Sequence, residues 1–363
     1  MKIQAAVSRN KHAPPLIEDV DLDEPQPNEA RVRIVATGIC HTDLSCHHGQ
    51  GVPVPVPIVL GHEGAGIVES VGAGVRGLKP GDHVVLSGAS CGLCPSCRAA
   101  RPTYCRDAMK LSFGGMRADG SSPLSQGGIR IAGAFFGQSS FATHVNVPES
   151  TAVKVPADVP LQLLGPLGCG IITGAGAMLE AFKIAPGQSV AIFGVGSVGL
   201  AAVMAARIAG AASIVAVDVS SQRLQVAKEL GATAVVTSNE ATEKALREIQ
   251  PYGFTYSFNT THAPAVYSLA TACLANEGTA GVVTRPQGEW TLNVGHLLAG
   301  GRKMQGILGG SANPHLFIPL LIEYWRQGRF PFDRLITEFA FADLGQAWQA
   351  AKGGDVIKPL LRM

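Results

Sequence analysis

Charged side chains are scarce in this chain: Asp, Glu, Lys and Arg make up 15% of its 363 residues, whereas 46% are hydrophobic. A chain this long and this apolar is expected to be globular, and its length suits two domains. The formal net charge is only +2, with both signs interspersed along the sequence. The composition therefore predicts no nucleic-acid partner and no association with an anionic membrane surface.

The sequence also lacks the marks of export and of membrane insertion. Residues Met1–Asn10 have no apolar core of the kind that a signal peptide carries, so we expect a cytoplasmic protein. One stretch, Ser189–Val217, is apolar almost throughout, yet four glycines interrupt it and β-branched residues cluster at both ends. A buried strand, a helix and a second strand explain this pattern better than a membrane-spanning helix does.

The succession of apolar runs predicts an α/β protein with two domains. Residues 1–155 are typical of a β-rich domain, because short apolar runs alternate with Gly, Pro and Asp turn signals. In residues 156–292, strand-length apolar runs alternate with helical segments, which predicts right-handed βαβ units and a doubly wound parallel sheet. Residues 293–363 turn mixed again, and we expect them to complete the edge of the second domain and return to the first.

A glycine motif lies early in the second domain. The segment Gly194–Gly199 reads G-V-G-S-V-G; it follows the strand-like run Ser189–Phe193 and opens an Ala- and Val-rich helix. In this context the first glycine makes a tight turn, the second lets a pyrophosphate approach the backbone, and the third lets helix and strand pack closely. The phosphates would lie at the helix N-terminus, where free N–H groups favour anions. The residues that we expect to contact a dinucleotide here are Gly194, Gly196, Ser197, Val198 and Gly199.

An acidic residue ends the next predicted strand. Asp218 follows Gly199 by 19 residues, the interval at which a carboxylate accepts the ribose hydroxyls of NAD and repels the 2′-phosphate of NADP. The alternative is that Asp218 only caps the following helix, a role that Ser220 could also fill. With the glycine motif in place we favour the cofactor role and predict NAD.

Four of the eight cysteines lie within 15 residues of one another. In a chain with no export signal, clustered cysteines more often bind metal than form disulfides. Four closely spaced thiolates make a closed tetrahedral zinc site with no position for substrate, which is a structural site. Iron–sulfur ligation is the alternative, although no partner redox motif accompanies it. The predicted ligands, in a lobe of about residues 88–108, are Cys91, Cys94, Cys97 and Cys105.

Three further ligand-type residues are separated in sequence. Cys40 lies in the segment G-I-C-H-T-D, His62 in G-H-E-G, and Cys169 in G-P-L-G-C-G. Each alone is unremarkable, because a lone cysteine or histidine is usually structural. Together they supply the Cys2His set of a catalytic zinc with an open fourth position.

These segments, the four-cysteine lobe and the later glycine motif, in this order, resemble the zinc-containing medium-chain alcohol dehydrogenases. Within that family the sequence looks most like bacterial aryl-alcohol (benzyl alcohol) and geraniol dehydrogenases, on the segments Phe136–Phe141, Leu164–Gly170 and Gly328–Leu335. The resemblance implies a GroES-like catalytic domain in residues 1–155, a Rossmann domain in 156–292, and a return segment in 293–363.

The same resemblance implies the roles of the site residues. Cys40, His62 and Cys169 would hold the catalytic zinc, with Glu63 beside it. Asp43 would accept a hydrogen bond from His62 and fix its tautomer. The remaining implied roles are removal of the substrate proton by Thr42, a ribose contact by Arg223 and a pyrophosphate contact by Lys358.

The implied reaction is the reversible oxidation of a primary allylic or aromatic alcohol, of the geraniol, perillyl or benzyl alcohol type, to the aldehyde. Zinc would stabilise the alkoxide, and hydride would pass to NAD. Two zinc ions per chain are expected. The partners would be the small alcohol and aldehyde and a second copy of the chain, with a dimer favoured over a tetramer because the segment between Cys105 and Phe136 is long.

The sequence departs from the family at two places. Ser45 stands where better-known members have a proton-relay histidine, and we interpret the nearby His47 and His48 as solvated loop residues. Asn259-Thr260-Thr261 replaces an acidic residue and glycine. We read Cys46 and Cys273 as ordinary thiols.

Three phenylalanines, Phe135, Phe136 and Phe141, predict an apolar substrate pocket, although two of the three are expected to be core residues. Two rival functions remain open at this stage. One is a zinc-free quinone or enoyl reductase of the same superfamily, and the other is a non-catalytic NAD-binding redox sensor.

Overall fold

The computed structural model describes residues 1–354 and 356–363. They form two compact units, which are treated separately below. Unit 1 comprises Met1–Cys169, Asn313–Leu320 and Asp333–Met363, and unit 2 comprises Gly170–Ala312 and Leu321–Phe332. The first segment thus extends past the expected limit at residue 155, because the short turns Leu161–Leu163 and Gly165–Gly168 contact strands of unit 1.

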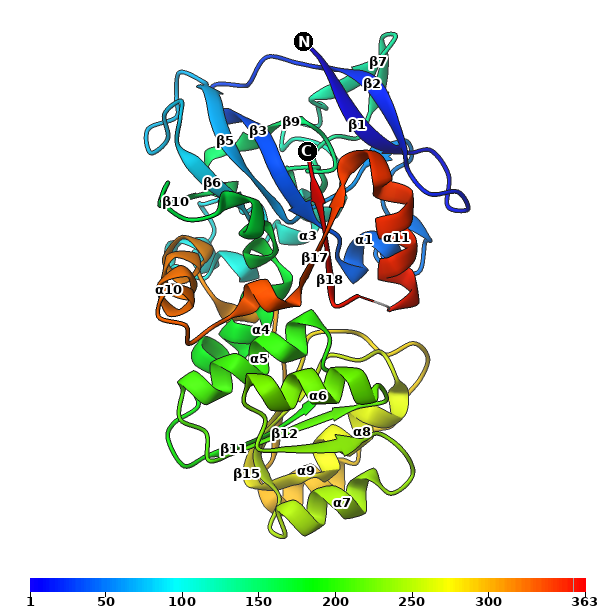
Figure 1. The fold of residues 1–363 in the computed structure, drawn as a ribbon, viewed down its shortest axis with the longest axis vertical. Coiled ribbons are helices and arrows are strands. Elements are labelled where there is room, and N and C mark those ends of the chain that lie inside the picture. Colours follow the sequence, from blue (N-terminus) through cyan, green and yellow to red (C-terminus); the bar gives the residue numbers. More distant parts are fainter. Residues whose placement is uncertain (355) are drawn as a thin grey trace. The chain divides into compact units, whose positions relative to one another are not determined.

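Unit 1 is built on two sheets (Figure 1). The first has the order β4 (Ile58–Val59), β1 (Lys2–Ser8), β2 (Leu16–Leu22), β7 (Leu124–Gln126) and β8 (Ile129–Ile131). The second has the order β10 (Ala152–Val155), β6 (His83–Leu86), β5 (Gly64–Val71), β3 (Glu29–Gly38), β18 (Lys358–Arg362) and β17 (Ile336–Ala340), and β9 (His144–Pro148) also pairs with β3. The C-terminal strand β18 pairs antiparallel with β3, so the end of the chain lies in the same sheet as the N-terminal half of unit 1.

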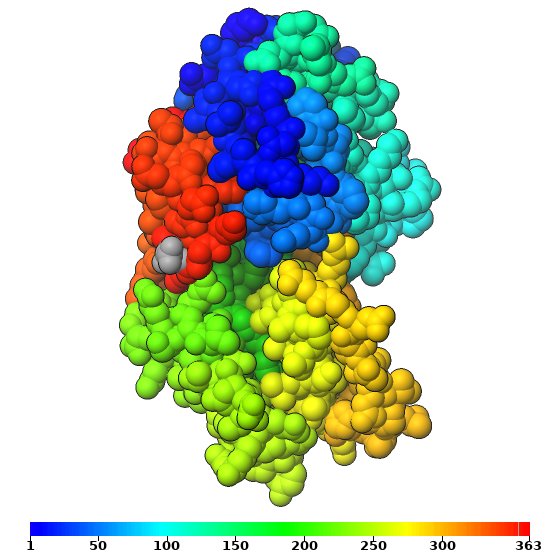
Figure 2. All heavy atoms as spheres, turned by 90° about the vertical axis from the view of Figure 1, so that its right-hand side faces the viewer, coloured from blue at the N-terminus to red at the C-terminus, as the bar shows by residue number. Residues whose placement is uncertain are grey.

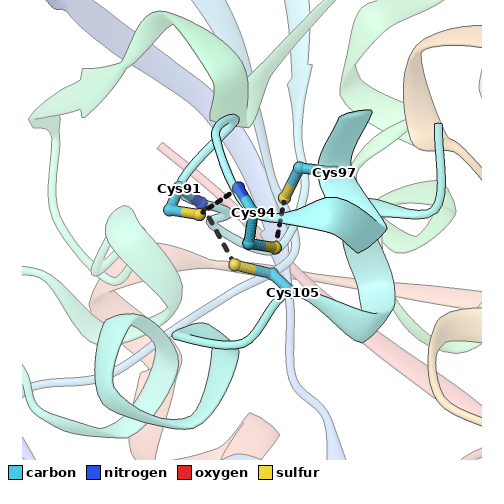
Figure 3. Close-up of side chains that lie close together, drawn as sticks. All are labelled: Cys91, Cys94, Cys97 and Cys105. Atoms are coloured by element: carbon cyan, nitrogen blue, oxygen red, sulfur yellow. Dashed lines mark hydrogen bonds between the residues drawn. The ribbon is translucent and has the colours of Figure 1, made fainter. Parts of the chain in front are cut away.

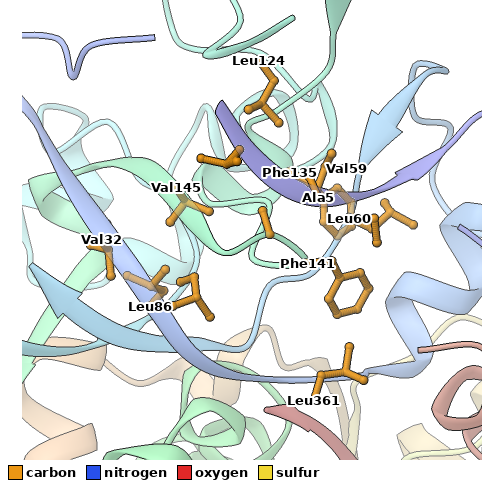
Figure 4. Packing of buried hydrophobic residues seen from close by; sticks show 14 of the residues in the cluster. Ala5, Val32, Val59, Leu60, Leu86, Leu124, Phe135, Phe141, Val145 and Leu361 are labelled. Atoms are coloured by element: carbon orange, nitrogen blue, oxygen red, sulfur yellow. The ribbon is translucent and has the colours of Figure 1, made fainter. Parts of the chain in front are cut away.

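Helices are short in unit 1. They are α1 (His41–His47), α2 (Pro95–Arg98), α3 (Ala108–Phe113) and α11 (Leu344–Gly353), and α10 (Pro314–Arg326) is shared between the units. One buried hydrophobic cluster fills the unit (Figure 4), with Val32, Leu60, Phe135, Phe141 and Leu361 among its members. Strand β3 pairs antiparallel with β5 and also with β9, and its C-terminal end, at Gly38, lies two residues before Cys40.

Unit 2 contains one parallel sheet with the order β13 (Ala234–Thr237), β12 (Ser213–Asp218), β11 (Ser189–Phe193), β14 (Phe254–Asn259), β15 (Leu274–Val282) and β16 (Lys303–Gly306). This is the 3-2-1-4-5-6 order of a doubly wound dinucleotide-binding sheet. Every residue of β11 is buried, as expected for a strand covered on both faces. The edge strand β16 comes from the segment after residue 292.

Helices cover both faces of this sheet. Figure 1 shows α5 (Ser197–Ile208) and α6 (Ser221–Leu230) on one face, and α7 (Thr242–Ile249) and α9 (Val294–Gly300) on the other. The remaining helices of the unit are α4 (Gly170–Gly176) and α8 (Pro264–Ala272). The apolar stretch Ser189–Val217 forms β11, α5 and most of β12, so the interpretation as strand, helix and strand is confirmed. Within the described residues, no helix is both long enough and apolar enough to cross a bilayer.

Candidate active site

The four clustered cysteines converge in a loop that follows β6 (Figure 3). Their sulfur atoms all lie within 4.8 Å of one another, and the Sγ atoms of Cys94 and Cys97 are 3.6 Å apart. In a tetrahedral zinc site with Zn–S bonds of about 2.3 Å, neighbouring sulfurs are roughly 3.8 Å apart. The spacing therefore fits a single zinc ion.

Backbone amides also point at these sulfurs. The Arg106 N–H donates to Cys94 Sγ at 3.5 Å, and the Asp107 N–H donates to Cys105 Sγ at 3.4 Å. The first of these bonds lowers the pKa of Cys94 to about 6, whereas burial raises the pKa of Cys97 to about 12. A divalent ion between the four sulfurs would favour the thiolate form of each. The lobe lies at the surface of unit 1, where Leu93 is 71% exposed and where Figure 2 shows the cyan segment around residue 100.

A second ligand cluster joins Cys40, His62, Glu63 and Cys169, whose ligand atoms also lie within 4.8 Å of one another. Three parts of the chain bring them together. Cys40 is the N-cap of α1, directly after β3. His62 and Glu63 lie just before β5, and Cys169 follows the turn Gly165–Gly168.

Asp43 aligns two of these segments. Its Oδ2 accepts the Cys40 N–H at 2.9 Å, while its Oδ1 accepts the Gly61 N–H at 3.0 Å and lies 3.0 Å from His62 Nδ1. The carboxylate is fully buried and makes Nδ1 the protonated nitrogen of His62. Asp43 thus joins the segment of Cys40 to the segment of His62.

The other ring nitrogen of His62 shows that the site fits a metal. His62 Nε2 is buried and makes no hydrogen bond, which is costly for a polar atom unless it has another partner. With Nδ1 protonated, Nε2 carries a lone pair beside the two thiols. This donor set, two sulfurs and one imidazole nitrogen, is one that zinc takes.

The charges in this cluster are tightly linked. A hydrogen bond from the Cys169 thiol lowers the pKa of Cys40 well below its usual value and raises the pKa of Cys169 well above it. Burial alone would lower the pKa of His62, but the Asp43 carboxylate and Cys40 outweigh it and raise that pKa. Two thiols this close to a buried imidazole form a set of donors that a divalent cation would complete.

Lys358 takes a position that the sequence did not indicate. Its Nζ lies 3.0 and 2.9 Å from the two carboxylate oxygens of Glu63 and 3.3 Å from the Ile39 carbonyl oxygen. Only 2% of the residue is exposed, and an ammonium has three donors. These three acceptors engage Lys358 within unit 1, so the pyrophosphate contact that was expected of it would require it to leave them. Both residues of this ion pair stood among the candidates, but no sequence pattern links positions so far apart.

Thr42 lies at the edge of the ligand cluster, with its Oγ1 3.8 Å from Cys40 Sγ. The two histidines further along the helix lie elsewhere. His47 is buried, its Nδ1 is 2.8 Å from Ser8 Oγ, and its ring packs edge-on against Trp348. The interpretation of His47 as a solvated loop residue is therefore wrong, because α1 turns it inward against α11.

The three phenylalanines divide as predicted. Phe135 and Phe141 are fully buried in the core of unit 1. Phe136 is only partly buried and stacks on the His62 ring, with centroids 4.5 Å apart and planes 24° apart. Cys46 and Cys273 are each 2% exposed and lie in hydrophobic clusters, as expected of ordinary thiols. No disulfide joins any of the eight cysteines, all of which are described.

The glycine motif of unit 2 occupies the turn between β11 and α5. Gly194 has φ of +82°, which only glycine adopts freely. A Cβ on Gly199 would lie 2.0 Å from the Gly194 carbonyl oxygen, whereas a Cβ on Gly196 would meet nothing within 4 Å. The third glycine therefore serves packing, and the second leaves open space before Ser197 and Val198, the first residues of the helix.

Asp218 ends β12 beside this turn. Its Oδ2 accepts the Val195 N–H at 2.7 Å and its Oδ1 accepts the Ser220 N–H at 2.9 Å. Helix α6 is capped by Ser220, which accepts the Arg223 N–H at 3.3 Å, so Asp218 is not its cap. A carboxylate has about four lone-pair sites, and two remain for ribose hydroxyls.

The segment of residues 259–261, which differs from the family pattern, begins at the last residue of β14, at this same edge of the sheet. Asn259 is fully buried; its Oδ1 accepts from the Thr261 N–H at 2.8 Å, and its Nδ2 makes no hydrogen bond. Thr260 Oγ1 donates to the Gly194 carbonyl oxygen at 2.8 Å. Ligands of doubly wound sheets bind at the carboxyl ends of the strands, where the strand order reverses. In unit 2 this point lies between β11 and β14, the edge at which Asn259 and Thr260 are found.

Comparison with known proteins finds a family match in the sequence of each unit. Residues 26–157 match the family model of the alcohol dehydrogenase GroES-like domain, and residues 197–323 match that of the zinc-binding dehydrogenases. The chain is 45% identical to the geraniol dehydrogenase of Castellaniella defragrans, over 99% of this chain and 97% of that relative.

Solved structures are equally similar. An alcohol dehydrogenase zinc-binding domain protein from Burkholderia ambifaria superposes with a TM-score of 0.97 at 46% identity, covering 100% of this chain and 99% of that one. The benzyl alcohol dehydrogenase of Acinetobacter calcoaceticus gives a TM-score of 0.95 at 40% identity, with the same coverage. With these similarities and the ligand clusters described above, the chain belongs to the zinc-containing medium-chain alcohol dehydrogenases.

Proposed function

We propose that this protein oxidises primary allylic or aromatic alcohols to aldehydes, reversibly, with NAD as hydride acceptor and two zinc ions per chain. The observation that carries the proposal is the cluster of Cys40, His62 and Cys169, in which the buried Nε2 of His62 has no hydrogen-bond partner among the described residues. Three protein ligands leave a fourth position for the substrate oxygen.

Each residue of this site has a task in the reaction. Cys40, His62 and Cys169 would hold the zinc, which when bound acts as a Lewis acid that lowers the pKa of the alcohol. Thr42, whose hydroxyl lies beside Cys40, would accept the proton that the alcohol gives up. With Ser45 in place of a histidine, water would carry that proton on to solvent.

The cofactor preference follows from charge. Asp218 is 6% exposed and lies against the glycine turn. Its carboxylate would accept the ribose hydroxyls of NAD and repel the 2′-phosphate of NADP. Arg223, three residues into α6, is the further ribose contact that we propose.

The substrate class follows from the aromatic surroundings of the metal ligands. Phe136 stacks on His62, and Phe113 packs edge-on against Phe136 at 5.1 Å. An apolar, aromatic environment beside the site favours an unsaturated or aromatic alcohol over a polyol. The names of the geraniol and benzyl alcohol dehydrogenases to which the chain is similar agree with this preference. We further propose a cytoplasmic homodimer.

One kinetic panel tests the function. NADH formation would be followed at fixed NAD with geraniol, perillyl alcohol and benzyl alcohol, and with glycerol and sorbitol for comparison. We expect turnover of the first group and little of the second. Faster oxidation of glycerol or sorbitol would contradict the substrate class, and quinone reduction without alcohol oxidation would favour a zinc-free type of reductase.

A further inference from the structure

A buried amide side chain holds the segment that carries His62. Gln138 is fully buried, and its Nε2 donates to the His62 carbonyl oxygen at 3.0 Å and to the Ser87 carbonyl oxygen at 3.2 Å. Its Oε1 accepts the Gly64 N–H at 3.2 Å. One side chain thus forms hydrogen bonds to the backbone on both sides of Glu63 and to the residue that follows β6.

The same end of β6 also holds the segment that carries Cys169. Ser87 Oγ donates to the Gly168 carbonyl oxygen at 3.0 Å, one residue before the ligand. Close packing restricts this contact further, because a Cβ on Gly168 would lie 2.0 Å from the Leu86 carbonyl oxygen. Ser87 is therefore the link between Gln138, on the His62 side, and Cys169.

Gln138 is itself held by a constrained turn. Phe136, Gly137 and Ser139 all have positive φ, of 52°, 71° and 51°, a region that non-glycine residues adopt at a cost. Ser139 Oγ stabilises the turn by accepting the Phe135 N–H at 2.9 Å and donating to the Val59 carbonyl oxygen at 2.7 Å. This turn also places the Phe136 ring on the His62 imidazole.

From this network we infer that Gln138 and Ser87 are positioning residues, which set the separation and orientation of the metal ligands His62 and Cys169. The inference rests on the proposed assignment of these ligands to zinc. The hydrogen bonds of Gln138 and Ser87 go to backbone atoms, so each residue acts on a ligand through the backbone that carries it. Partners of this indirect kind typically change metal affinity about 10- to 100-fold when they are removed.

The test replaces Gln138 with a residue of similar length that cannot form these bonds, Gln138→Met, and replaces zinc with Co(II). The visible spectrum of the cobalt protein reports ligand geometry, and the part that disappears in His62→Ala belongs to this site. We expect Gln138→Met to shift that part and to accelerate chelator-driven zinc loss from it about 10- to 100-fold. Metal release from the four-cysteine site should stay as in the unmodified protein.

Asn146→Ala is the matched control. Asn146 is another buried amide of unit 1, 2% exposed, and its Nδ2 donates to the Asp23 carbonyl oxygen at 2.9 Å. Its loss should lower stability but leave the cobalt spectrum unchanged. Ser87→Ala removes only the bond to Gly168, and we expect a smaller shift in the same part of the spectrum; this variant decides if Gln138→Met fails to fold.

The outcomes separate this inference from the function on which it rests. Wild-type spectra and zinc release in the folded Gln138→Met and Ser87→Ala proteins would overturn the positioning role. An equal spectral shift in Asn146→Ala would also overturn the positioning role, since a general destabilisation of unit 1 would then explain the shift. If the unmodified chain took up no cobalt that depends on His62, the metal assignment itself would fail and the inference with it.

Discussion

At the scale of single residues, the active site depends on buried charged groups that are paired with one another or with backbone amides. Asp43 accepts three hydrogen bonds while fully buried, from Cys40, Gly61 and His62. Lys358 neutralises Glu63 in the same region. Unpaired buried charges are strongly destabilising, so each of these pairs fixes the conformation of both of its members.

Asp43→Asn tests the orientation of His62. The amide oxygen can replace only one acceptor of the carboxylate, and its NH2 group cannot accept the Cys40 N–H. We expect zinc affinity at the three-ligand site and kcat/KM to fall about 10- to 100-fold. Zinc competition assays and alcohol kinetics would measure both, and unchanged zinc affinity would refute the orienting role.

Asp218→Asn tests cofactor choice. The amide keeps an acceptor for the backbone but removes the negative charge near the ribose. The preference for NAD over NADP, measured as the ratio of kcat/KM values, should fall by at least about tenfold, or ~1.4 kcal/mol. An unchanged ratio would mean that another group selects the cofactor.

His47 predicts a pH dependence of stability. Burial, with a contribution from neighbouring His48, lowers the pKa of His47 below its usual value of 6.5. In the unfolded chain His47 binds a proton first as pH falls, so its contribution to stability is complete above pH 6.5 and declines below it. Urea unfolding between pH 7 and 5 should show a slope that His47→Gln reduces, by up to ~1.4 kcal/mol per pH unit. An identical slope in the two proteins would contradict this prediction.

At the scale of secondary-structure elements, two glycines in the turn between β11 and α5 serve different purposes. Gly199 allows α5 to pack on the turn, since its Cβ would strike the Gly194 carbonyl oxygen. Gly196 borders open space and has an ordinary negative φ of −73°. The same residue type thus serves packing at one position and ligand approach at the other.

This difference predicts opposite outcomes for two alanine variants. Gly199→Ala should lower the free energy of unfolding by about 1–3 kcal/mol, because the backbone must move to admit a methyl group. Gly196→Ala should leave stability nearly unchanged but weaken NAD binding. Thermal melts and NAD titrations would separate the two, and a destabilised Gly196→Ala protein would contradict the assignment.

At the scale of the whole molecule, the chain carries two ligand clusters with different tasks. The four-cysteine lobe lies in a surface loop of unit 1, where few apolar side chains could hold it. The three-ligand cluster of the same unit joins ligands from distant parts of the sequence, and hydrogen bonds from several segments hold it. A metal would therefore stabilise the fold at the four-cysteine site and act as a catalyst at the three-ligand site.

Cys97→Ser should remove one metal and leave the other. We expect zinc content, measured by elemental analysis, to fall from two ions to one per chain, with a lower melting temperature because the loop loses its cross-link. The remaining zinc should still depend on His62. A loss of both ions, or of neither, would contradict the independence of the two sites.

Much of this arrangement could be predicted from local sequence. The glycine turn, the run of buried strands in unit 2 and the close spacing of Cys91, Cys94, Cys97 and Cys105 are short-range patterns, because a few consecutive residues set both the backbone conformation and the chemistry. The separated ligands Cys40, His62 and Cys169 were grouped by resemblance to a family and not by any spacing.

Contacts between distant segments became visible only in the folded structure. The pairing of Lys358 with Glu63, the inward turn of His47 and the grip of Gln138 on His62 and Ser87 each join residues far apart in the chain. No periodicity marks such residues, since their partners are mostly backbone carbonyls and buried side chains brought near by folding. Residue types and short motifs indicate which groups could bind metal and cofactor, whereas the packing of β3, β5, β6 and β18 decides how those of unit 1 are held.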